Sequence, residues 1–408
     1  MESALDSGEV VEYVWLIGNW QNTGLNGRSS MCSRGRRCDV LPAWLMLVLA
    51  LAASQTAHGA ALFWDESPLP LRDIEFVQVA SSGATLLASA RSVDEPSSPT
   101  MLFTSNDGLD WTLIDPGLAG RAIDAVGFAL DRFVVVLNDG HLLVGDDAAS
   151  WSALPGPVDR RLKEISLLEH SGRIWLLARW DLGDLATVGL ISSADFAEWT
   201  VEYSTESSGT FVPSLRGLAA GGGTFAATWF PPPPTGPTLR LTVALNEDDW
   251  LFASPRGPAV ASRQVVWNGS AFMAIASQNG SSTALGLVRG TPDGVFDFVV
   301  RPGHVGRFSS LRGGPDGLIL QQSGGANRLL TSSNGIEWFA QPAIPTGTFR
   351  DFVRWQGGWV GVGTTTIRGL PAQARPVPAL SLSGLITVSL GLVLAGAFAV
   401  IRNGSRSC

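Results

Sequence analysis

Seven arginines are the residues whose type and placement most suggest a binding chemistry in this chain. Each precedes or opens a segment expected to form the innermost strand of a repeat: Arg72, Arg121, Arg161, Arg216, Arg263, Arg307 and Arg350. A guanidinium group matches a carboxylate or a phosphate with two parallel hydrogen bonds. If several of these side chains converge, they form an electropositive funnel for a carboxylate, a phosphate or an acidic glycan. The alternative is that they pair with neighbouring acids.

Catalytic and metal chemistry find less support. Asp73 and Glu75 project from one face of an extended strand, as a glycoside hydrolase with paired carboxylates requires, but acids at a strand entrance are usually solvated. Neither Tyr13 nor Tyr203 is placed as a nucleophile, because the first precedes the expected export signal and the second lies on an expected outer strand. The histidines are isolated: His58, His141, His170 and His304. We therefore predict no catalytic residues, no metal site and no cofactor.

Short strands joined by tight turns are the elements that would position these arginines. A turn signal recurs seven times, and glycine is present in all but the second: Ser82-Gly83, Leu130-Asp131, Ser171-Gly172, Gly222-Gly223, Asn268-Gly269, Asp316-Gly317 and Gly357-Gly358. Glycine tolerates the positive φ that tight hairpins require. We expect each turn to join the first and second strands of one repeat.

Aromatic residues mark the same repeat. They follow one another at intervals of 47, 40, 48, 51, 48 and 40 residues: Trp64, Trp111, Trp151, Trp199, Trp250, Phe298 and Trp338. A four-stranded propeller blade has about this length. The sequence therefore predicts an all-β, seven-bladed β-propeller over residues 60–370. The alternatives are a six-bladed ring and a string of small sandwiches.

The turn before the aromatic residue has a motif of its own. Ser105-Asn106-Asp107-Gly108-Leu109-Asp110-Trp111 recurs as Ser332-Ser333-Asn334-Gly335-Ile336-Glu337-Trp338, and Ser193-Ala194-Asp195-Phe196-Ala197-Glu198-Trp199 lacks only the glycine. In such a turn a short Asx side chain accepts backbone N–H bonds, and the aromatic residue packs between sheets.

These motifs resemble the Asp-box, or BNR, repeat of sialidase-like and photosystem-assembly-factor-like propellers. The resemblance implies that the box is structural and lies away from the ligand-binding face. It therefore implies a structural role for these residues: Ser105, Asp107, Gly108, Trp111, Asp195, Trp199, Ser332, Asn334, Gly335 and Trp338.

The two ends of the repeat region complement each other. Residues 349–369 supply two or three strands but no aromatic box, whereas Ala61-Leu62-Phe63-Trp64 stands alone before the first full repeat. Pairing Trp64 with residues near Thr364 to Arg368 would complete the last blade and leave no open sheet edge. We therefore expect a ring closed by the N- and C-terminal strands.

The N-terminal residues indicate export. Residues 1–30 are acidic and precede Met31, so we interpret them as a misassigned extension. Residues 31–59 have the pattern of a signal peptide, with arginines before an apolar run and small residues at a cleavage site near Ala60. The alternative is an uncleaved N-terminal anchor.

The C-terminal residues indicate attachment to a membrane. We expect a proline-rich linker over 371–378, a transmembrane helix over 379–401 and a basic cytoplasmic tail over 402–408. The segment from Val377 resembles the IPTL-type bacterial C-terminal sorting signal, with Leu382-Ser383 in place of its usual Glu-Trp pair. The alternative is a plain transmembrane anchor.

Net charge and these segments together define the expected function class. The formal charge of −8 argues against a nucleic-acid partner. We expect an exported propeller, tethered outside the cytoplasm at the cell membrane or surface, that is a binding or scaffold module and not an enzyme. Its expected partners are an envelope protein or an acidic glycan, and a sorting protease at the tail. The alternatives are a glycan-acting hydrolase of sialidase-like fold and an assembly factor for a membrane complex.

Overall fold

The computed structural model describes residues 62–94, 99–118, 120–182, 185–208, 214–230, 240–244, 264–277, 285–292, 295–300, 307–323, 328–342 and 348–371. The chain divides into two units, Met1–Ala57 and His58–Cys408, and every described residue belongs to the second. The expected N-terminal extension, signal peptide, transmembrane segment and tail lie outside the described residues, and so does the expected linker except for Pro371, which belongs to a strand and not to the linker. Trp250 and Arg263 also lie outside the described residues. Within the described residues, no helix is long and apolar enough to cross a membrane.

Every element of the described residues is a β-strand, and the strands form seven antiparallel sheets, numbered here 1 to 7 along the chain. Sheet 1 contains β2 (Ile74–Ser81), β3 (Leu86–Ser92), β4 (Met101–Ser105) and β5 (Thr112–Ile114). Sheet 2 contains β6 (Ile123–Ala129), β7 (Arg132–Leu137), β8 (Leu142–Gly145) and β9 (Ser152–Leu154). Sheet 3 contains β10 (Leu162–His170), β11 (Arg173–Leu182), β12 (Leu185–Ser193) and β13 (Thr200–Ser208).

The remaining sheets follow the same order. Sheet 4 contains β14 (Ser214–Gly221), β15 (Thr224–Phe230) and β16 (Arg240–Ala244). Sheet 5 contains β17 (Val265–Trp267), β18 (Phe272–Ser277), β19 (Leu285–Gly290) and β20 (Phe296–Val300). Sheet 6 contains β21 (Arg307–Gly314), β22 (Gly317–Ser323), β23 (Arg328–Ser332) and β24 (Phe339–Ala340). Sheet 7 contains β25 (Phe349–Trp355), β26 (Gly358–Gly363), β27 (Thr366–Pro371) and β1 (Leu62–Ser67).

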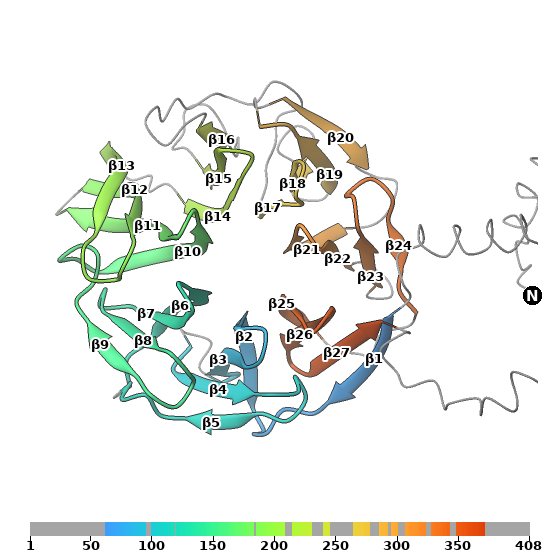
Figure 1. The fold of residues 1–408 in the computed structure, drawn as a ribbon, viewed down its shortest axis with the longest axis horizontal. Helices are drawn as coiled ribbons and strands as arrows, with labels where there is room; N and C mark the ends of the chain where they lie inside the picture. The colour runs from blue at the N-terminus through green and yellow to red at the C-terminus, as the bar shows by residue number, and fades with distance from the viewer. Residues whose placement is uncertain are drawn as a thin grey trace, which may run out of the picture. The chain divides into compact units, whose positions relative to one another are not determined.

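The sheets are arranged as a closed ring, which is a β-propeller (Figure 1). The first strand of each sheet lies innermost and contacts the first strand of the next sheet, and β25 contacts β2. Six of the sheets are complete four-stranded blades, while sheet 4 has three described strands. Six sheets therefore confirm the predicted four-stranded blade, and sheet 4 shows three of its four predicted strands within the described residues. The aromatic residue expected to mark the outer strand of sheet 4 is Trp250, outside the described residues.

The ends of the ring meet as expected from the sequence. Strand β1 pairs with β27 from Leu62 opposite Pro371 to Ser67 opposite Thr366. Trp64 lies opposite Gly369, one position beyond the predicted partners. A Cβ atom on Gly369 would lie 2.7 Å from the indole ring of Trp64, so this position has no room for a side chain. The strand at the start of the propeller therefore completes the last sheet.

The predicted hairpin turns join the first and second strands of the sheets, with two corrections of one residue. The turn of sheet 7 is Gln356-Gly357, with φ of 47° and 75°, and Gly358 is already the first residue of β26. A Cβ atom on Gly358 would lie 2.0 Å from the carbonyl oxygen of Gly369, so close strand packing explains this glycine. In sheet 6 the turn precedes Gly317, which pairs with Gly314.

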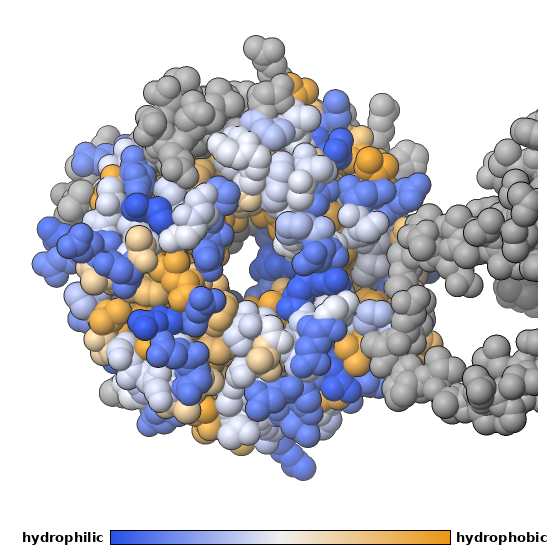
Figure 2. Space-filling view, viewed as in Figure 1, coloured by the Kyte–Doolittle hydropathy of each residue, from blue (hydrophilic) through white to orange (hydrophobic). Residues whose placement is uncertain are grey.

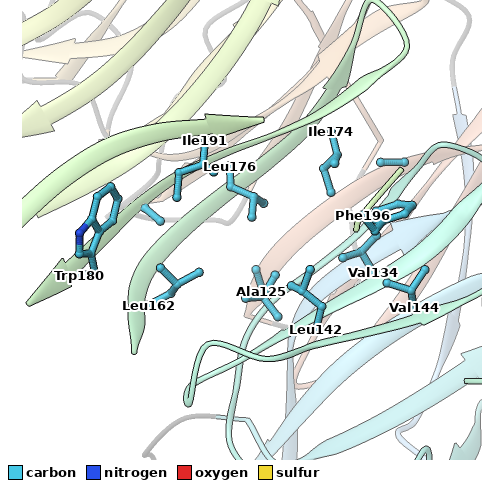
Figure 3. Packing of buried hydrophobic residues seen from close by; sticks show 13 residues of the cluster. Ala125, Val134, Leu142, Val144, Leu162, Ile174, Leu176, Trp180, Ile191 and Phe196 are labelled. Carbon is cyan, nitrogen blue, oxygen red and sulfur yellow. The ribbon is translucent and has the colours of Figure 1, made fainter. Parts of the chain in front are cut away.

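The core consists of layers between neighbouring sheets. Ala125 and Val134 of sheet 2 pack with Leu162, Leu176 and Ile191 of sheet 3 in one buried cluster (Figure 3). Each fully buried aliphatic side chain stabilises the fold by about 1.5–3 kcal/mol. Because each layer is shared by two sheets, stability adds roughly sheet by sheet.

Candidate functional site

The innermost strands form the wall of the central channel of the ring, and they share an irregularity that shapes this wall. Six of them shift register near their start: between Phe76 and Gln78, Ile123 and Ala125, Lys163 and Ser166, Leu215 and Gly217, Phe308 and Ser310, and Phe349 and Asp351. A bulge increases the local twist and redirects side chains. Each innermost strand also has only one sheet neighbour, so its other backbone edge needs partners from elsewhere.

Side chains from neighbouring sheets supply some of these partners. Gln78 of sheet 1 accepts the backbone N–H of Val126 of sheet 2 at 3.1 Å. Gln264, just before β17, accepts the N–H of Leu311 of sheet 6 at 2.6 Å. Such bonds satisfy edge groups that would otherwise be buried without partners.

Asp351 forms the corresponding bond where the ring closes. Its Oδ2 accepts the N–H of Val79 in sheet 1 at 3.1 Å. Its Oδ1 accepts the Nε–H of Arg312 at 2.5 Å and the N–H of Phe352 at 2.9 Å. Asp351 is only 7% exposed, so this carboxylate is a fixed part of the channel wall.

These groups surround a cavity of about 410 Å³ in the channel. All seven innermost strands contribute to its lining. Polar side chains come mainly from sheets 1, 6 and 7: Gln78, Ser81, Arg312 and Asp351. Apolar side chains come mainly from sheets 2, 3 and 4: Val126, Phe128, Ile165, Leu167 and Leu218. Figure 2 shows the same asymmetry, with hydrophilic residues on the β21 and β25 side of the opening and hydrophobic residues on the β6 and β10 side.

Of the seven predicted arginines, Arg72, Arg121, Arg161 and Arg350 are described with their side chains, and none of these four lines the cavity. Arg350 of β25 donates from Nε to Glu75 Oε1 at 2.5 Å, and Arg91 donates from Nη2 to Glu75 Oε2 at 2.9 Å. Burial would raise the pKa of Glu75, but the hydrogen bonds and charges of Arg350 and Arg91 outweigh it and hold the pKa below its ordinary value. Glu75 is thus buried and paired, so the expectation of a solvated acid was wrong.

The other described arginines of the set lie on or just before the innermost strands of different sheets. Arg121 bonds to Asp139 at 3.4 Å and to two carbonyl oxygens of its own loop. Arg72 and Arg161 are exposed, and no ion pair is formed by either within the described residues. Arg216 and Arg307 lie on β14 and β21.

Asp124 is an acid that the sequence did not single out. It lies at the bulge of β6, and its Oδ2 atom is buried without a hydrogen-bond partner among the described residues. Burial raises the pKa of Asp124 to about 6, against the lowering effect of the Arg161 and Lys163 charges. The protein therefore disfavours the charged form of this side chain.

The turns at residues 105–111, 193–199 and 332–338, called the box turns below, have the local geometry that the motif predicts. Asp107 Oδ1 accepts the N–H groups of Leu109 and Asp110 at 2.9 and 2.8 Å, and Ser105 Oγ accepts that of Gly108 at 2.9 Å. The same bonds recur around two other pairs: Ser193 with Asp195, and Ser332 with Asn334. Phe196 replaces the glycine and has a φ of 65°.

Two of the three indoles also bond within their turns. Trp199 and Trp338 donate to the carbonyl oxygens of Phe196 and Gly335, at 3.0 and 3.1 Å. Trp111 is buried against Phe76, and its ring centroid lies 5.0 Å from that of Phe76. These contacts make the box residues parts of the turns and of the layers between sheets.

Sequence analysis missed the residues that line the cavity. A weak signal was available, because Gln78 and Gln264 each lie four residues before a hairpin turn, at Ser82 and Asn268. Arg312 had no such signal, because its importance depends on Asp351 in a different sheet.

No protein-family model and no curated protein matches the chain. Among solved structures, it is similar to the WD40 domain of Toxoplasma gondii coronin, with 10% identity, 78% of this chain and 90% of that chain covered, and a TM-score of 0.46. It is also similar to uncomplexed Pyrococcus horikoshii acylaminoacyl peptidase, with 10% identity, 73% and 51% covered, and a TM-score of 0.50.

A third similar structure is a puromycin hydrolase, with 18% identity, 71% of this chain and 50% of that chain covered, and a TM-score of 0.48. The chain thus spans about half the length of the peptidase and of the hydrolase. At such identities the similarity concerns the fold alone. The ring of sheets itself identifies the described part of the chain as a β-propeller.

Proposed function

We propose that this protein is an exported, membrane-tethered propeller of seven blades that acts as a binding or scaffold module at the cell envelope, with its ligand held in the central channel. The observation that carries the proposal is the cavity of about 410 Å³ to which all seven innermost strands contribute. Ligand sites are concave, mostly preformed, and combine apolar walls with a few placed polar groups.

The channel wall fits this description because its polar side chains are held by hydrogen bonds. Gln78 bonds to two backbone groups of sheet 2, and Asp351 joins sheet 6 to sheet 1. Groups fixed in this way lose little conformational freedom when a ligand binds, which increases affinity. The proposal therefore places recognition in the channel and a structural role in the box turns.

Export and tethering enter the proposal from the sequence. The apolar run after Arg37 and the small residues before Ala60 support export, and the apolar stretch over 379–401 followed by Arg402 supports a single anchor with the propeller outside the cytoplasm. A binding module held by one helix and a proline-rich linker would reach partners close to the membrane surface.

The test is affinity capture by the tagged full chain from a solubilised envelope fraction. A Ser166→Trp variant fills the channel, since Ser166 lines the cavity. A matched Ser152→Trp variant places the same side chain on the exposed outer strand β9. We expect an envelope component to be retained by the unmodified chain and by Ser152→Trp, and to be lost with Ser166→Trp. Equal retention by all three proteins would exclude the channel as the binding site.

A further inference from the structure

Arg312 is a fixed hydrogen-bond donor with unused capacity. Its Nε donates to Asp351 Oδ1 at 2.5 Å, and its Nη1 donates to the carbonyl oxygen of Leu311 at 3.2 Å. A guanidinium group carries five N–H donors, so three have no partner among the described residues, and both donors of Nη2 are among these three. The side chain is 31% exposed and lines the channel cavity. The protein thus presents an oriented cationic group to the space in the channel.

In the described lining, no other cationic side chain competes with Arg312 for an anionic ligand, and Asp351 is its one anionic neighbour. Arg312 and Asp351 are the charged side chains among the described residues of that lining. The oxygens of Asp351 already accept three N–H donors, from Val79, Phe352 and Arg312. Asp351 therefore orients the guanidinium group, and the remaining donors of Arg312 favour an anionic acceptor.

The register of the strands makes Arg312 distinctive. After the bulge of β21 the regular pairing resumes at Ser310, and Arg312 lies two residues further along the strand. The corresponding residues of four other innermost strands also line the cavity and are small or apolar: Ala80, Gly127, Leu168 and Val353. A long cationic side chain at this level is therefore a feature of sheet 6 and no property of the repeat.

Apart from Ser166, the side chains that sheets 2, 3 and 4 contribute to the described lining are apolar. Val126, Ile165, Leu167 and Leu218 line the cavity and are each only half-buried, so they expose apolar surface to the channel. Covering such surface is favourable in proportion to its area. A ligand that fills the cavity therefore meets a cationic donor on one wall and hydrocarbon on the other.

We propose that the channel binds a small amphipathic carboxylate, with its carboxylate on Nη2 of Arg312 and its apolar body against Val126, Leu167 and Leu218. The inference rests on the proposed function, because it takes the channel as the binding site. Taking about 30 Å³ for each water-sized group, the cavity of about 410 Å³ has room for a small molecule and is too small for a folded domain. Carboxylates bind guanidinium groups through strong charge-assisted hydrogen bonds.

The first experiment compares three probes of one shape on the full chain in lipid nanodiscs, by titration calorimetry with empty nanodiscs as the blank. The probes are 3-phenylpropionate, the neutral 3-phenylpropionamide and the cationic 3-phenylpropylamine. We expect the carboxylate to bind at least about ten-fold more tightly than the amide, and the amine not to bind. This comparison needs no variant. Equal binding of the amide, or binding of none of the probes, would overturn the proposed ligand class.

The second experiment tests the residue. An Arg312→Gln variant should lose about ten-fold or more in affinity for 3-phenylpropionate. Arg354→Gln is the matched control, because Arg354 of the same ring bonds to Asp316 O and lies outside the lining of the cavity; it should change the affinity less than about two-fold, as expected for a residue away from the site. Unchanged affinity in Arg312→Gln would contradict the assignment.

Two further outcomes separate this inference from the proposed function. Tighter binding of glucuronate than of 3-phenylpropionate would refute the apolar part of the proposal, because glucuronate is a carboxylate with a polar body. If the carboxylate fails to bind while Ser166→Trp still abolishes envelope capture, the channel remains the site and the ligand class is wrong. If Ser166→Trp does not affect capture, the proposed function itself fails.

Discussion

Asp124 makes the stability of this propeller dependent on pH, and its effect can be worked out in sign and size. Burial raises the pKa of Asp124 to about 6, whereas a carboxyl group in an unfolded chain titrates near 3.9. Well below about pH 3.9 the group is protonated in both states and costs nothing. As the pH rises from about 4 to about 6, the unfolded state has released the proton while the folded state still holds it, so the folded state loses stability.

The magnitude follows from the difference of about two pKa units. Each unit corresponds to about 1.4 kcal/mol, so Asp124 destabilises the fold by about 3 kcal/mol at pH 7.5. At pH 4 the cost is below about 1 kcal/mol. An Asp124→Asn variant removes the titration. We therefore expect its stability relative to the unmodified protein to improve by about 2 kcal/mol between pH 4 and pH 7.5.

The assay is unfolding of the full chain, followed by tryptophan fluorescence at several pH values. The change with pH is diagnostic, because any constant cost of burying the amide cancels in the comparison. Asp297→Asn is the matched control for replacing an aspartate by an asparagine, since Asp297 is an exposed residue of β20. A constant difference for Asp124→Asn across this range would refute the reasoning, because Asp124 would then titrate alike in the folded and unfolded states.

Three other outcomes follow from the ring and from the proposed tether. Gly369→Ala should lower the free energy of unfolding by about 1–3 kcal/mol, because a Cβ atom would lie 2.7 Å from Trp64. Gly314→Ala is the control, because Gly314 has open space around it. Equal unfolding curves for the two variants would contradict the closure of the ring. Asp351→Ala should lower it by about 3 kcal/mol, because the N–H groups and the arginine on its carboxylate lose their acceptor; an unchanged denaturation midpoint would contradict this. Deleting 379–401 should move the protein from the membrane to the soluble fraction after cell fractionation, and retention in the membrane would contradict the proposed anchor.

The repeat could be predicted from sequence because its signals are local. Turn pairs such as Leu130-Asp131 adopt positive φ at both positions, with values of 51° and 59°, and alternating or apolar runs beside them form β6 and β7. Even the closure of the ring was accessible, because a lone strand at Trp64 and an incomplete last repeat complement each other. The errors of one residue at Gly358 and Gly317 reflect glycines that serve close packing or a strand end and not the turn itself.

The candidate site was less accessible for a physical reason. Acids near the start of a strand are usually solvated, so Glu75 was expected at the surface, whereas Arg350 and Arg91 from two other strands bury and neutralise it. Arg350 itself was expected to serve an anion, and it meets this carboxylate instead. Arg312 lines the cavity among the described residues, and it lies late in its strand and outside the pattern of the other seven.

The amino-acid sequence alone determined the strands, their turns and the order in which the sheets follow one another, because these depend on neighbours along the chain. Only the tertiary structure decided which groups share the channel, because Gln78, Arg312 and Asp351 come from different sheets. Asp351 lies 272 residues from the N–H group it accepts. A contact of that kind depends on closing the ring, and a polar residue read by itself carries no sign of the partner it will meet there.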